Sequence, residues 1–381
     1  MNKKICGSPL EKLTPLQTRH KCDIICRAVT NPPKTNHPQS EDKAVQTKKS
    51  QRNVYLDLFK FFLSFMIIAI HLAGESYPHF PLYRLSVPMF FIISGYFCYS
   101  DSAERVMQKA RALIPRTLKY MAVGFGIYIV FDFIGCFIEG HGVGYYFTTL
   151  FYEDFLLEFL FLNRPITYTG AQLWFLIALF VVSLVHFLLV KFDRLHYYKV
   201  IVPVCYAIYF FFAGYMYLLQ NTDMPIRYTR NAWFFGLPNF GLGFLLARVD
   251  FHRKSWYKYV YLFLGVSCYF LQILEYRLVK ADNISLEMYI TGVLSAVFFL
   301  QFFLGIERAG CDFYYKWIGK NGPFYIYILH MAVAVVLAKF FTFPNLMAKC
   351  AAVFAVSFLI YEAAYLIGML IAYKRRTKQE A

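Results

Sequence analysis

Charged residues are scarce in this chain of 381 residues, where Asp, Glu, Lys and Arg together make up 16% of the sequence. Soluble proteins carry roughly 25% charged residues. Hydrophobic residues reach 59%, including 42 Phe and 31 Tyr, and a single soluble core could not cover so much apolar surface. The composition therefore excludes an ordinary cytosolic enzyme, a disordered protein and a secreted disulfide scaffold. It indicates a polytopic membrane protein.

Several functional patterns are also missing. The nine cysteines form no framework: most lie singly in apolar stretches, and Cys22 and Cys26 lack a second ligand pair, so we expect no metal site. No Gly-rich phosphate loop, G-x-S-x-G elbow or H-E-x-x-H motif occurs. No secretory signal peptide is expected either, because the first 50 residues contain no adequate hydrophobic segment.

The apolar runs predict an all-α fold with about ten transmembrane helices. Each run is about 17–25 residues long, as a bilayer requires. The expected spans are 54–74, 86–101, 119–139, 172–190, 200–219, 232–247, 258–275, 286–306, 321–341 and 346–373. They form one transmembrane domain over 52–373, which follows a disordered basic tail over 1–51 and precedes a short basic tail over 374–381.

The distribution of basic residues predicts the orientation. With both tails in the cytoplasm, the inner loops hold most Lys and Arg, and the outer loops hold only Arg84, Arg164, Arg227, Arg230, Arg277 and Lys280. Most of the net charge of +16 is then explained by topology, so no nucleic-acid partner is needed. This count treats 145–162, which carries three acidic residues, as an interfacial or re-entrant helix.

The first span carries a polar stripe. At 100° per residue, five polar residues fall within about 60° of one another on its surface. They are Asp57, Lys60, Ser64, His71 and Glu75. Such residues are costly in a bilayer and face a bundle interior or a watery cavity. Alternatively, Asp57 and Lys60 snorkel at the cytosolic boundary, and Glu75 lies in the outer loop. His71 lies about 16 Å from Lys60 along the axis, and histidine is well suited to accept a proton from an alcohol.

The segment LDLFKFFLSFMIIAIH, with Lys60 and His71 separated by ten residues, resembles the Arg-x10-His signature of the membrane-bound acyltransferase 3 family. In this chain Lys replaces the usual Arg. The segments LYRLSVPMFFIISGYF, KARALIPRTLKY, QLWFLIALF, RNAWFFGLPNFGLG and YIYILHM resemble later segments of the family in order and spacing, although Gln172 stands where a His is often found. The resemblance runs from about Arg52 to Arg375.

This resemblance implies an integral membrane O-acyltransferase. It would move an acyl group, expected to be acetyl, from cytosolic acyl-CoA, a co-substrate and not a bound cofactor, to a hydroxyl of an extracytoplasmic carbohydrate. The resemblance implies His71 as the catalytic base, and Lys60 as a fixed cation for a phosphate or carbonyl of acyl-CoA. Arg111 and Arg116, expected in a cytosolic loop, would hold its phosphates, because clustered guanidinium groups favour phosphate; positive-inside anchoring is the alternative.

Arg84 and Arg230 lie on the outer side, where topology does not explain basic residues. We expect them to contact the acceptor or the reacting acyl group, with interfacial anchoring as the alternative. Trp174 is a candidate to stack on a sugar ring, or else belongs to the aromatic belt. His330 is a second membrane histidine, and we expect one of Asp132, Glu139 and Glu362 to orient His71.

Two other classes of function stay open at this point. The fold also resembles the membrane half of vancomycin-resistance serine racemases, so a non-enzymatic membrane module related to serine transport is one alternative. A scaffold subunit of a polysaccharide export machine is another. In each case we expect a multi-pass protein of the plasma membrane, and the sequence leaves open whether it forms a homo-oligomer.

Overall fold

The computed structural model describes residues 53–73, 80–140, 142, 144, 147–148, 154–215, 228–249, 251, 254–279, 286–306 and 322–380. All of them belong to one compact unit, Asn53–Ala381. The predicted tail over 1–51 and the residues Glu75, Arg227 and Lys280 lie outside the described residues.

The described part of the chain is helical and contains no strand, which confirms the all-α class. Its longer helices are α3 (Val54–Ala73), α5 (Ser86–Cys98), α6 (Ala103–Ile138), α9 (Trp174–Lys191), α10 (Tyr198–Tyr209), α12 (Leu237–Leu246), α13 (Tyr257–Val279), α14 (Ile290–Gly305), α16 (Gly322–Phe340) and α17 (Leu346–Glu380). Short elements precede, extend or connect them: α4 (Phe80–Tyr83), α8 (Phe155–Leu157), η1 (Glu158–Leu162), η2 (Ala171–Leu173), η3 (Leu195–Tyr197), η4 (Phe210–Tyr215) and η6 (Ala232–Gly236).

The helices fit the predicted polytopic membrane protein. Among the described residues, eight helical segments are long and apolar enough to cross a bilayer, and two shorter apolar helices cover Ala232–Leu246 and Ile290–Gly305. These ten segments lie at the ten predicted spans. The second span differs in its start, since it begins at Phe80 in α4 and turns at Arg84 before α5 begins.

Two helices are longer than the predicted spans. The basic segment before the third span is not a loop: residues 103–118 form the first half of α6, which Ser102 caps by accepting a hydrogen bond from the backbone N–H of Arg105. Likewise, the basic residues after 373 continue α17 as helix. At 1.5 Å per residue, each helix is about 50 Å long and extends beyond a hydrocarbon core of about 30 Å.

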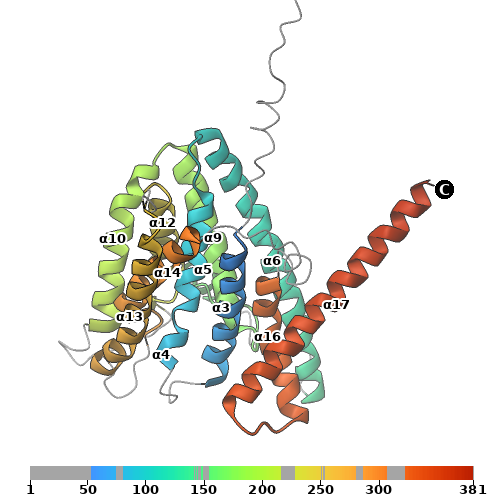
Figure 1. Cartoon of the computed structure of the whole chain (residues 1–381). Coiled ribbons are helices and arrows are strands. Elements are labelled where there is room, and N and C mark those ends of the chain that lie inside the picture. The colour runs from blue at the N-terminus through green and yellow to red at the C-terminus, as the bar shows by residue number, and fades with distance from the viewer. Residues whose placement is uncertain are drawn as a thin grey trace, which may run out of the picture. The chain divides into compact units, whose positions relative to one another are not determined.

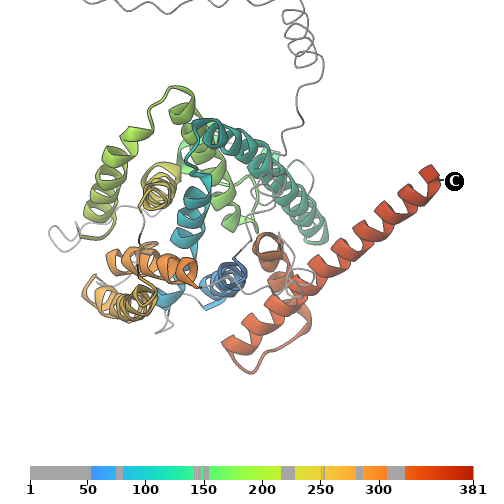
Figure 2. The same ribbon diagram turned by 45° about the horizontal axis from the view of Figure 1, so that its top comes forward.

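α3 lies inside the bundle and packs against α4, α5, α14, α16 and α17 (Figures 1 and 2). Other helices pack in pairs, α6 with α9, α13 with α14, and α16 with α17. The second half of α17 runs away from the other helices in both views, and its apolar side chains are exposed there. In a membrane protein such an exposed apolar face contacts lipid.

α5 and α12 approach each other closely, backbone against backbone. A Cβ atom on Gly95 would lie 1.9 Å from the backbone oxygen of Phe240, and one on Gly243 would lie 1.9 Å from that of Ile92. Each helix therefore places a glycine against the backbone of the other, as membrane helices do when small residues line their contact. This contact fixes α5, whose two ends contribute to the site.

Candidate active site

The polar stripe of α3 faces α16. Ser64 is fully buried, and its hydroxyl donates to the backbone oxygens of Lys60 (3.0 Å) and Pro323 (3.2 Å). Seven residues further along each helix, the rings of His71 and His330 meet with their centroids 5.3 Å apart and their planes tilted by 35°. The equal spacing means that α3 and α16 run in the same direction, as the first and ninth of ten spans must.

His330 is held by the backbone of its own helix. Its Nδ1 lies 2.6 Å from the backbone oxygen of Tyr327, and its buried Nε2 has no hydrogen-bond partner among the described residues. The hydroxyl of Tyr128 from α6 contacts the backbone of α16 at this turn: it donates to the oxygen of Ile328 (2.8 Å) and accepts from the N–H of Ala332 (3.2 Å).

Two arginines share one carboxylate at the His71 end of the bundle. Arg84 is 6% exposed and forms an ion pair with Glu287, which is 4% exposed, and Arg230 reaches the other oxygen of Glu287 at 3.4 Å. Arg84, which was expected to contact the acceptor or the acyl group, is therefore buried, with its Nη1 held by Glu287. Glu287 was not among the predicted site residues. The signal that could have indicated it is an acidic residue at the outer end of a span, on the same side of the membrane as two unexplained arginines.

Local structure fixes each member of this cluster. Asn231 accepts hydrogen bonds from the N–H groups of Trp233 and Phe234 and so caps the helix that follows Arg230. The guanidinium of Arg230 lies 5.6 Å from the ring centroid of Trp174, the first residue of α9. Trp174 is 6% exposed, so it supports Arg230 from within the protein and does not offer an open face to a sugar. The His71 imidazole interacts electrostatically with His330, Arg84 and Arg230, which places these groups in one cluster.

A second basic cluster surrounds the end of α5, at the Lys60 end of the bundle. The Lys60 ammonium lies 3.0 Å from Asp57 and 5.4 Å from the ring centroid of Phe97. Lys109 donates a hydrogen bond to the backbone oxygen of Tyr99, and the Arg248 guanidinium lies 6.0 Å from the ring centroid of Tyr99.

Arg116 belongs to this cluster and Arg111 does not. Both Lys109 and Arg116 interact electrostatically with Cys98, the last residue of α5. Seven residues separate Lys109 and Arg116, which places them on nearly the same face of α6. Lys109, Arg111 and Arg116 are all exposed, but Arg111 lies about 140° around the helix from Arg116. The described contacts therefore group Arg116 with Lys109 and not with Arg111.

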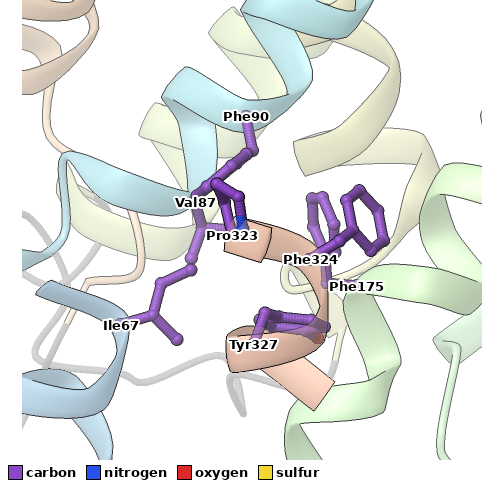
Figure 3. A pocket seen from close by; sticks show the side chains of 7 residues that line it. All are labelled: Ile67, Val87, Phe90, Phe175, Pro323, Phe324 and Tyr327. Atoms are coloured by element: carbon purple, nitrogen blue, oxygen red, sulfur yellow. The ribbon is translucent and has the colours of Figure 1, made fainter. Parts of the chain in front are cut away.

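An apolar pocket separates the two clusters. It is lined by Ile67, Val87, Phe90, Phe175, Pro323, Phe324 and Tyr327, is partly open, and has a free volume of about 10 Å³, enough for about one water molecule. Figure 3 shows these side chains converging from α3, α5, α9 and α16. Ile67 lies on α3 between Lys60 and His71, so the pocket lies along the line that joins the two ends of the site.

The three acidic residues that were candidates to orient His71 differ in their surroundings. Asp132 accepts hydrogen bonds from the N–H of Tyr168 (2.6 Å) and from the N–H and hydroxyl of Thr169. Glu139 is the C-cap of α6. Glu362 follows Tyr361, whose ring stacks on Tyr325 of α16, and one oxygen of Glu362 is buried without a hydrogen-bond partner among the described residues. Within the described ranges, no group of three or more His, Cys, Asp or Glu side chains could hold a metal ion.

The arrangement combines an imidazole and two guanidiniums at one end, a small apolar pocket, and a second set of cations at the other end. Such a site can accept a proton at one end and bind an anionic group at the other. The chain matches the model of the acyltransferase 3 family, described as an acyltransferase domain, over residues 53–373. No curated protein and no solved structure matches it. The family match covers all ten apolar helices, and the chain therefore belongs to the acyltransferase 3 family of membrane acyltransferases.

Proposed function

We propose that this protein transfers an acyl group, acetyl in the simplest case, from acyl-CoA in the cytosol to a hydroxyl of an extracytoplasmic carbohydrate. The observation that carries the proposal is the line formed by a basic cluster at the Lys60 end, an apolar pocket, and a histidine beside two arginines at the His71 end. These three parts match the three parts of an acyl-CoA reaction: an anionic nucleotide, an uncharged thioester arm, and a carbonyl that develops negative charge.

The donor binds at the Lys60 end. Lys60, Lys109 and Arg116 surround the end of α5 and face the phosphates of CoA, while Arg111 lies at the rim. Charge-assisted hydrogen bonds to phosphate are about twice as strong as neutral ones, and several cations in one place favour a group with several negative charges. The thioester then reaches the apolar pocket, whose walls must move apart to admit the acyl group and whose apolar side chains then exclude water from it.

The reaction takes place at His71. The acceptor oxygen attacks the thioester carbonyl while a ring nitrogen of His71 takes the hydroxyl proton. As the tetrahedral intermediate collapses, the C–S bond breaks and the proton passes from the imidazolium to the thiolate, so the products are the ester and CoA. Arg230 is 32% exposed and lies nearest to open space in its cluster, so it stabilises the oxyanion or contacts the acceptor. Arg84, Glu287 and Trp174 hold Arg230 in place.

Purified protein in lipid nanodiscs tests this proposal with radiolabelled acetyl-CoA. Transfer to water or to a carbohydrate fraction is measured for wild type, His71→Ala and Lys60→Gln. We expect His71→Ala to lower turnover by about 100- to 10,000-fold, the range for general acid–base catalysis. Lys60→Gln raises KM for acetyl-CoA. Full activity in His71→Ala contradicts the mechanism, and absence of any CoA-dependent thermal shift in wild type contradicts the donor.

A further inference from the structure

The second membrane histidine has a geometry that a packing role does not require. When neutral, an imidazole carries one N–H and one lone pair. Because a carbonyl oxygen can only accept, the contact between Nδ1 of His330 and the Tyr327 oxygen places the N–H on Nδ1. Nε2 is then the lone-pair nitrogen, and it is buried with no partner in the described part of the chain. A buried acceptor without a partner is costly unless a group arrives during function.

The group beside it is His71. The two rings are 5.3 Å apart between centroids, and their helices run in parallel with the same spacing from the Ser64–Pro323 contact. The rings of His71 and His330 form no hydrogen bond with each other in this structure. Catalytic hydrogen bonds are often long before substrate binds and shorten in the complex.

We infer that His330 is the positioning residue of His71: its Nε2 accepts a hydrogen bond from one ring N–H of His71 and so fixes the tautomer and orientation of that ring. The other nitrogen of His71 then carries the lone pair and faces the acceptor hydroxyl. This role rests on the proposed function, in which His71 is the base. When His71 takes the proton, the bond to His330 becomes charge-assisted and stabilises the imidazolium.

The surrounding charges explain why a neutral group fills this role. A carboxylate commonly orients a catalytic histidine. In this cluster Glu287 is already shared by Arg84 and Arg230, and the two oxygens of Asp132 are occupied by the turn at Tyr168 and Thr169. An imidazole locked by its own helix supplies an acceptor without a further buried charge, which would be expensive in this setting.

Two amide substitutions separate the two nitrogens of His330. His330→Gln places an amide oxygen near the position of Nε2 and loses the bond to Tyr327, whereas His330→Asn keeps a donor near Nδ1 and loses the acceptor that faces His71. We expect His330→Asn to lower kcat by about 10- to 100-fold, the usual loss when the orienting partner of a functional histidine is removed. KM for acetyl-CoA should stay near wild type. His330→Gln should keep most of kcat.

His186 provides the matched control. It is equally buried, its Nδ1 lies 3.1 Å from the Tyr198 hydroxyl, and its Nε2 also lacks a partner among the described residues, but it packs against Phe240 and Phe244, far from His71. His186→Asn and His186→Gln should leave kcat unchanged. Thermal midpoints of all variants show which of them are folded well enough to compare.

The outcomes distinguish this inference from the function on which it rests. If His330→Asn keeps kcat and His330→Gln loses it, the bond to Tyr327 matters and the positioning role is wrong. If both variants behave like wild type while His71→Ala is inactive, only the positioning role is wrong. If His71→Ala keeps full activity, the proposed function itself is wrong.

Discussion

The contact between α5 and α12 predicts a large effect from one methyl group. In Gly95→Ala the new Cβ would lie 1.9 Å from the Phe240 oxygen, whereas real Cβ contacts are essentially never closer than 3.0 Å. The obstacle is backbone, so the helices must separate by about 1 Å along their closest stretch. Overpacking of a rigid contact costs about 1–3 kcal/mol and sometimes more. We expect the upper end of this range, because no rotamer change can relieve the clash.

The loss of stability is measured by heating each variant in detergent and following the folded fraction by size-exclusion chromatography. A loss of about 3 kcal/mol should lower the midpoint by an amount on the order of 5 °C. Gly126→Ala is the control. Gly126 lies on an exposed face of α6 with no atom within 4 Å of its added Cβ, and Ala in a helix is favoured over Gly by about 0.5–1 kcal/mol.

The double variant Gly95→Ala/Gly243→Ala refines the test. Once one methyl group has separated the helices, the second meets less resistance, so the combined loss should be smaller than the sum of the single losses. Equal midpoints for Gly95→Ala and Gly126→Ala would refute the backbone contact. Activity should fall together with stability, because α5 carries Val87 and Phe90 of the pocket and Phe97 beside Lys60.

Three further predictions concern the site. Glu287→Ala leaves two guanidiniums without their carboxylate and should lower the free energy of unfolding by about 3–5 kcal/mol. Adding Arg84→Met should recover part of that loss. A double variant that is less stable than Glu287→Ala would contradict the shared ion pair. Arg116→Gln should raise KM for acetyl-CoA about tenfold with kcat unchanged, while Arg111→Gln stays near wild type; equal effects of the two would place the donor elsewhere. Phe90→Ala should raise the ratio of kcat/KM for butyryl-CoA to that for acetyl-CoA by about tenfold, because butyryl has two more methylenes and each gains about 0.8 kcal/mol on burial. If this ratio is unchanged, the pocket is not the acyl site.

The helices could be predicted because each depends on a local run of apolar residues. Hydropathy located all ten segments, and helical periodicity placed Ser64 and His71 on one face of α3, where the structure has them. Periodicity did not show that residues 103–118 would continue α6 as helix. Charged residues there were interpreted as a loop, although Ser102 and Glu104 form a helix start that the sequence already contained.

The site could be predicted only in part. Lys60 and His71 belong to one helix, so their spacing is visible in the sequence. Glu287 lies more than 200 residues from Arg84, and His330 more than 250 residues from His71, and no local pattern joins residues so far apart. Long-range packing also decides which basic residues of α6 belong to the Lys60 end: a helical wheel separates Arg111 from Arg116, but only the position of α5 shows which of them faces the cluster.

One helix carries residues of both ends of the site. α6 is continuous from Ala103 to Ile138, and Arg116 precedes Tyr128 by about 18 Å along its axis. The same helix thus carries a cation of the Lys60 end and, further along, the hydroxyl that donates to the Ile328 oxygen and accepts from the Ala332 N–H beside His330. A displacement of α6 along its axis would break both of these hydrogen bonds unless α16 moved with it. The position of Arg116 and the backbone around His330 are therefore linked through a single helix.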